Sequence, residues 1–182
     1  MRSIGRLNGD VSTIEVATLV LLGVTAAVLS AYVRIGLKIP GHAIVLAVLP
    51  MAFGFAIVPR QLAGTAMSAS ALLTAALLSV SGARYLGGGA MMSLTAVGPL
   101  LDLALARARG GWRLYLGFVL AGLAANMLAF SVRGGSKLLQ LDAKGTRLFA
   151  DWLSQAAVTY VLSGAIAGLV SAACWFRMRH TR

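Results

Sequence analysis

The chain has 182 residues, of which 59% are hydrophobic and only 12% are charged, and its mean hydropathy is +0.86. A water-soluble domain of this size carries about a quarter charged residues. The composition therefore excludes an ordinary soluble enzyme and predicts one integral membrane domain with short loops. The 16 Lys and Arg against 5 Asp and Glu lie between apolar stretches. That distribution is typical of loop charges beside anionic lipid headgroups, so we expect no nucleic-acid binding.

Six apolar runs follow one another, each close to the roughly 20 residues that a helix needs to cross a bilayer. They predict an all-α polytopic membrane protein, a six-transmembrane-helix bundle, with spans at about 13–33, 41–58, 62–80, 90–106, 112–132 and 152–176. Pro50 lies inside the second span and predicts a kink there. Residues 133–151 mix leucines with charges and form either a plain connection or a short amphipathic segment on the membrane surface.

Lys and Arg in alternate loops indicate the orientation of the bundle. They are slightly more numerous on the side that holds both termini, where the compact segment 106–113 and the basic tail adjoin span ends. The positive-inside rule then predicts a multi-pass protein of the cell (inner) membrane with its N- and C-termini in the cytoplasm. In this orientation the second, fourth and sixth spans begin at the outer face and the fifth ends there.

Catalysis inside a membrane requires residues that these spans lack. The two histidines, His42 and His180, lie at a span end and in the tail, and Asp102 is the one aspartate well inside a span. The HExxH zinc motif and the Walker A motif are both absent from the sequence. We therefore predict that the chain is not an enzyme, holds no metal and needs no cofactor.

Polar and aromatic residues converge near the outer face. A buried amide or hydroxyl costs free energy in lipid unless it finds a partner, so several of them at one level predict a shared pocket for a small molecule. The candidate substrate-binding residues are His42, Arg84, Tyr85, Ser93, Asn126, Trp152 and Gln155.

These candidates also have ordinary interpretations. Tyr85 and Trp152 would be aromatic residues at the membrane interface, and His42 would cap a helix. Asn126 would hydrogen-bond between helices, and Arg84 would be a loop charge. The glycines at 87–89 are compatible with a lid over the pocket or with a passive hinge.

Small residues spaced by four mark three helix faces suited to close packing. On the first span this face is Gly23, Ala27 and Ala31, and it predicts either packing within the chain or docking of a second protein. The fifth and sixth spans carry similar stripes, for which packing within the chain suffices.

Asp102 stands near the inner end of the fourth span. A carboxylate at the centre of a span costs roughly 2.5–3.5 kcal/mol on insertion scales, so it needs a partner or a role. An ion pair with an arginine on the same side, such as Arg107, is one interpretation. Proton coupling and contact with a partner subunit are the alternatives.

The segments GHAIVLAVLPMAFGFAIVPR and GGGAMMSLTAVGPLLDLALARARGGWR, within six spans whose first carries a small-residue stripe, resemble the substrate-binding (S) component of energy-coupling factor (ECF) transporters. The resemblance covers most of the chain in architecture. It implies a subunit that captures a vitamin or another small molecule and works with a transmembrane coupling subunit and two ATPases on separate chains.

The resemblance also implies roles for particular residues. Gly23, Ala27 and Ala31 match the stripe that docks on the coupling subunit, and the implied pocket residues are Arg84, Tyr85, Asn126, Trp152 and Gln155. The cobalt and nickel members carry a histidine close after the initiator methionine. This chain begins MRSIGRLN, which argues against a metal as the substrate.

Two other functions remain open. A proton-coupled secondary carrier would use Asp102 as its coupling group. A non-transporting scaffold subunit of a membrane complex would tolerate replacement of the outer polar residues.

Overall fold

The computed structural model describes residues 12–33, 44–107, 111–139 and 149–180. These residues form helices and turns and contain no strand. The six helices are α1 (Thr13–Tyr32), α2 (Ile44–Ile57), α3 (Ala63–Val80), α4 (Gly88–Arg107), α5 (Trp112–Leu138) and α6 (Phe149–His180). All except α2 are long and apolar enough to cross a membrane. The structure thus confirms an all-α polytopic membrane protein.

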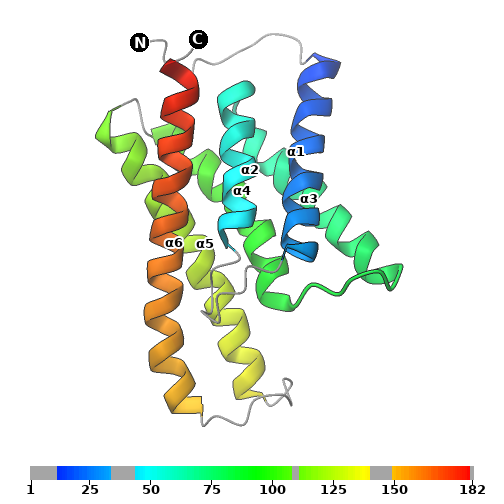
Figure 1. Ribbon diagram of the computed structural model, residues 1–182, viewed down its shortest axis with the longest axis vertical. Coiled ribbons are helices and arrows are strands. Elements are labelled where there is room, and N and C mark those ends of the chain that lie inside the picture. The colour runs from blue at the N-terminus through cyan, green and yellow to red at the C-terminus, as the bar shows by residue number, and fades with distance from the viewer. Residues whose placement is uncertain (1–11, 34–43, 108–110, 140–148, 181–182) are drawn as a thin grey trace.

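Successive helices run in opposite directions, so the first turn of α1 and the last turn of α6 lie at the same end of the bundle (Figure 1). We call this the N/C end, and we call the other, which holds Tyr32, the 81–87 turn and Leu138, the distal end. Helix α5 packs against both α4 and α6, while α1 packs against α3 and α2.

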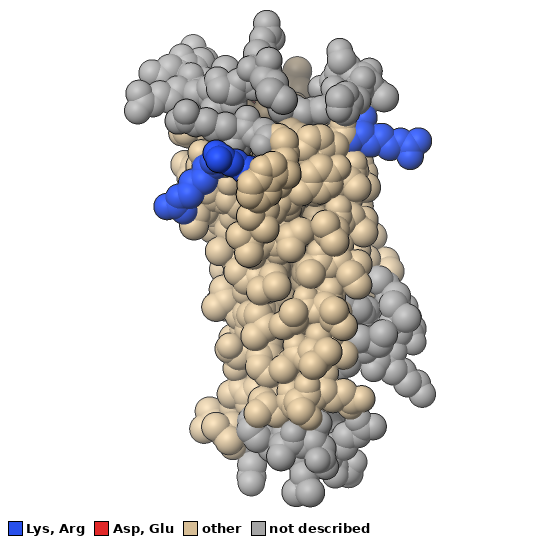
Figure 2. Space-filling view, turned by 90° about the vertical axis from the view of Figure 1, so that its left-hand side faces the viewer, with Lys and Arg blue, Asp and Glu red and all other residues tan. Residues whose placement is uncertain are grey.

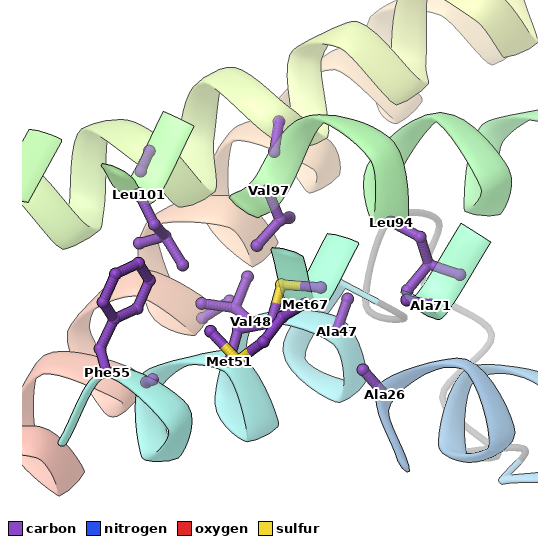
Figure 3. Packing of buried hydrophobic residues seen from close by; sticks show 14 of the residues in the cluster. Ala26, Ala47, Val48, Met51, Phe55, Met67, Ala71, Leu94, Val97 and Leu101 are labelled. Atoms are coloured by element: carbon purple, nitrogen blue, oxygen red, sulfur yellow. The ribbon is translucent and has the colours of Figure 1, made fainter. Parts of the chain in front are cut away.

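The short helix α2 forms the centre of the bundle. Its 14 residues, IVLAVLPMAFGFAI, include no polar side chain, as expected for a helix surrounded on all sides by protein. It contacts every other helix. The buried apolar cluster of the core includes Met51 and Phe55 of α2, Met67 of α3, and Leu94 and Leu101 of α4 (Figure 3).

Several helix crossings depend on glycine. At the α3–α4 crossing a Cβ atom added to Gly98 would lie 2.5 Å from the carbonyl carbon of Gly64. At the α5–α6 crossing a Cβ atom on Gly168 would lie 2.5 Å from the carbonyl oxygen of Phe118. Such contacts bring the backbones together and let dispersion forces hold helices that lipid does not drive together. The small-residue stripes of the fifth and sixth spans therefore pack within the chain, as predicted.

The outer surface of the bundle is apolar. Leu73, Leu77, Val158 and Ile166 each expose more than half of their surface. Figure 2 shows one face on which uncharged residues form a continuous surface and the Lys and Arg side chains gather toward the N/C end. An apolar belt of this kind would drive aggregation in water, whereas in a bilayer it is the lipid-contacting surface.

Candidate functional site

A cavity of about 530 Å³ opens at the distal end of the bundle. The start of α2, the turn before α4, and helices α4, α5 and α6 all contribute to its wall. The lining residues are Ile44, Tyr85, Gly87, Gly88, Gly89, Ala90, Ser93, Asn126, Ala129, Val132, Arg133, Ser136 and Tyr160. Its volume lies within the range of roughly 300–1,000 Å³ that is usual for small-molecule sites.

Three of the seven predicted site residues line this cavity. Tyr85 stands at the rim, since 81% of its surface is exposed, while Ser93 and Asn126 are buried. The Asn126 side-chain nitrogen donates a 2.6 Å hydrogen bond to the backbone carbonyl of Tyr160. Asn126 therefore joins α5 to α6, as its ordinary interpretation requires, and also borders the cavity.

Several polar groups of the lining have no protein partner. Ser93 and Tyr160 are 7% and 3% exposed, and neither hydroxyl makes a hydrogen bond to the described residues. The Arg133 guanidinium forms no ion pair within the described part of the chain. Neither hydroxyl oxygen is closed off from the cavity, so each can donate to or accept from a bound molecule. This arrangement favours a ligand that can hydrogen-bond to both hydroxyls.

The sequence did not reveal the part of the site that α5 contributes beyond Val132. Residues 133–151 were expected to form either a plain connection or a short amphipathic segment on the membrane surface. Instead, α5 continues through Arg133 and Ser136 to Leu138. One signal was available, because residues 112–139 contain no proline to end the helix. The continued helix carries Arg133 to the cavity.

Arg84 does not belong to the cavity wall. Its Nε donates a 3.1 Å hydrogen bond to the carbonyl oxygen of Ala31, and its guanidinium lies 5.9 Å from the centre of the Tyr32 ring. The last carbonyls of a helix lack partners within the helix, and a cation favours that end. Arg84 therefore caps α1, which corrects its predicted place in the pocket.

Trp152 and Gln155 also lie outside the cavity wall. The Trp152 ring stacks on Phe130 with 5.7 Å between ring centres, and the Lys137 ammonium lies 5.0 Å from the Trp152 ring. Trp152 thus holds the extended end of α5 against α6. The Gln155 side chain is exposed on α6. His42 lies outside the described residues.

The small-residue stripe of α1 faces the interior of the bundle. Ala27 is fully buried, Ala31 is 8% exposed, and Gly23 is buried. A Cβ atom on Gly23 would overlap the Ser70 hydroxyl and the Met67 carbonyl of α3. The stripe therefore packs within the chain, which is one of the two uses predicted for it.

Asp102 binds the first turn of α3. Its carboxylate oxygens accept hydrogen bonds from the backbone N–H of Gly64 at 3.0 Å and from the backbone N–H and hydroxyl of Thr65 at 2.7 and 2.6 Å. The first N–H groups of a helix have no helical acceptor and carry a partial positive charge. These N–H groups are the partner that the carboxylate needs. Asp102 and Arg107, which are both described, form no ion pair.

A separate ion pair lies at the N/C end. The Arg60 guanidinium, in the turn between α2 and α3, lies 2.8 Å from the Glu15 carboxylate in the first turn of α1. The same carboxylate accepts a hydrogen bond from the backbone N–H of Ser12. Arg60 therefore ties the start of α1 to the α2–α3 turn.

The described residues contain no cluster of three or more His, Cys, Asp or Glu side chains suited to a metal ion. Comparisons of the chain with known protein families, curated proteins and solved structures find no match. The distal cavity, with its unpartnered hydroxyls and its arginine, is therefore the feature on which a functional proposal must be built.

Proposed function

We propose that this protein captures a small molecule in the distal cavity and acts as the substrate-binding component of an ECF-type importer. The observation that carries the proposal is the pair of hydroxyls of Ser93 and Tyr160, which are accessible in a 530 Å³ cavity and make no hydrogen bond to the described residues. In this proposal the N/C end faces the cytoplasm and the cavity opens to the outside.

The cavity chemistry favours a ligand with one anionic end and an apolar body. Arg133 offers a planar fork of donors that suits a carboxylate. Ile44, Ala129 and Val132 provide apolar wall for the remainder of the molecule. A vitamin-sized carboxylic acid fits both requirements.

Energy for import would come from other chains. The sequence has no Walker A motif, so a transmembrane coupling subunit and two ATPases are the proposed partners. Because Gly23, Ala27 and Ala31 pack inside the bundle, contact with a coupling subunit would use another surface.

We expect Arg133→Gln to lower the retention of the bound molecule by about tenfold to a hundredfold, the loss that follows from removing one charge-assisted hydrogen-bonding group. Arg84→Gln is the matched control, since it removes the same charge at the same end of the bundle but outside the cavity wall. The measurement is mass spectrometry of small molecules and proteins that co-purify with the full chain from its native membranes.

The proposal requires a retained anionic compound together with a coupling subunit and ATPases. A retained compound without ATPases would instead favour a secondary carrier. Recovery of neither, with the cavity residues replaceable without effect, would favour a scaffold subunit. Equal loss of the compound in Arg84→Gln and Arg133→Gln would show that the cavity is not where the compound binds.

A further inference from the structure

A second, shallower hollow lies between α4 and α5 on the lipid-facing surface, in the half of the bundle nearer the N/C end. Its volume is about 380 Å³. We call it the α4–α5 groove, and its lining residues are Leu100, Leu103, Ala104, Arg107, Arg113, Leu116, Gly117, Leu120, Ala121 and Ala124.

The groove has a small-residue floor and leucine walls. At its floor α4 and α5 come close, since a Cβ atom on Gly117 would lie 3.4 Å from the Ala104 Cβ. Leu103, Leu116 and Leu120 line its two sides, and 50%, 43% and 54% of their surface is exposed. A narrow channel with flexible apolar walls suits a single hydrocarbon chain.

Both charges of the groove lie at one end. Arg107 is the last residue of α4 and Arg113 is the second residue of α5, so both lie at the N/C end. Both side chains are exposed, and neither forms an ion pair with a described residue. Two unpaired guanidinium groups at the membrane surface attract a phosphate group.

The length of the groove matches one leaflet of a bilayer. Along α5 it extends from Arg113 to Ala124, which at about 1.5 Å per residue is about 16 Å. The hydrocarbon core of a bilayer is about 30 Å thick, so one leaflet is roughly half of that. A phosphate held by the arginines would therefore place an acyl chain along the full apolar part.

We infer that the α4–α5 groove binds one anionic phospholipid from the leaflet at the N/C end. Arg107 and Arg113 hold the phosphate, and an acyl chain lies over Gly117 between the leucines. Charge complementarity favours this occupant, because a phosphate group can accept hydrogen bonds from guanidinium groups while its acyl chain covers the apolar part of the groove. This inference is independent of the proposed importer function.

The test is native mass spectrometry of the full chain in mixed micelles with equal amounts of phosphatidylglycerol and phosphatidylcholine. We expect the wild type to retain phosphatidylglycerol preferentially. In Arg107→Gln with Arg113→Gln this preference should fall about 30-fold, from the electrostatic contribution of two arginines near an anionic headgroup. Ala124→Phe, which fills the apolar end, should lower retention of both lipids.

The matched control is Arg177→Gln with Arg179→Gln, which removes two charges from the last turns of α6 at the same end of the bundle. This variant should keep the preference. Equal loss in the two double variants would show general surface attraction and overturn the site. Displacement of the lipid by inorganic phosphate, with no effect of Ala124→Phe, would show an anion site without an acyl groove and would also overturn it. Circular dichroism and gel filtration confirm that each variant is folded.

Discussion

Gly98→Ala is expected to lower the free energy of unfolding by about 3 kcal/mol, at the upper end of the usual cost of overpacking. The added methyl group would overlap the carbonyl oxygen of Gly64 and the Ser68 hydroxyl. Ser68 has no room to yield, because its hydroxyl donates to the Leu94 carbonyl at 2.6 Å and accepts from the Gly98 N–H at 2.9 Å. The backbones of α3 and α4 would have to separate.

The measurement is a denaturant titration in detergent micelles followed by circular dichroism. Gly135→Ala is the control, since its added Cβ atom meets nothing within 4 Å and alanine favours a helix over glycine by about 1 kcal/mol. It should leave stability unchanged or slightly raised. If Gly98→Ala unfolds at the same denaturant concentration as Gly135→Ala, the backbones of α3 and α4 do not cross as closely as the structure shows.

The succession of spans could be predicted from hydropathy because each helix in a membrane must satisfy its own backbone hydrogen bonds over a fixed thickness. The largest boundary error lies at the distal end. There α5 continues to Leu138, and α6 begins at Phe149. Charges near a helix end can reach the headgroup region, so a polar stretch marks where a span leaves the hydrocarbon but does not end the helix.

The sequence pattern predicted which residues share one face of a helix, but it did not predict what that face contacts. The spacing of Gly23, Ala27 and Ala31 fixes that they lie on one side of α1, and the structure confirms a close-packed side. Whether that side meets another helix of the same chain or a second protein depends on the tertiary arrangement. Periodicity contains no information on that point.

The candidate site was likewise predictable in part. Position along each helix axis was predictable, and Tyr85, Ser93 and Asn126 line one cavity. Rotation about the helix axis was not, and therefore Trp152 and Gln155 lie outside the cavity wall. Arg84 satisfies the end of α1 through a contact 53 residues apart in sequence, which no local pattern reveals.

The role of Asp102 distinguishes the two proposals, an importer component and a proton-coupled carrier. A carboxylate that accepts three hydrogen bonds from the start of α3 has a structural role. Hydrogen bonds to a charged group contribute about 1.5–3 kcal/mol. A coupling carboxylate, in contrast, must gain and release a proton during transport.

We expect Asp102→Asn to lower the free energy of unfolding by about 2 kcal/mol and to leave ligand retention per folded molecule unchanged. The amide keeps one acceptor oxygen, but its NH₂ group replaces the oxygen that accepts from the Thr65 N–H and hydroxyl. Thr65→Val, which removes only the hydroxyl donor, should cost about 1 kcal/mol. The measurements are denaturant titration and proton entry into proteoliposomes under an imposed pH gradient, reported by an internal dye. A variant that unfolds like the wild type but abolishes proton entry would identify Asp102 as a coupling group and make the carrier the better account of this protein.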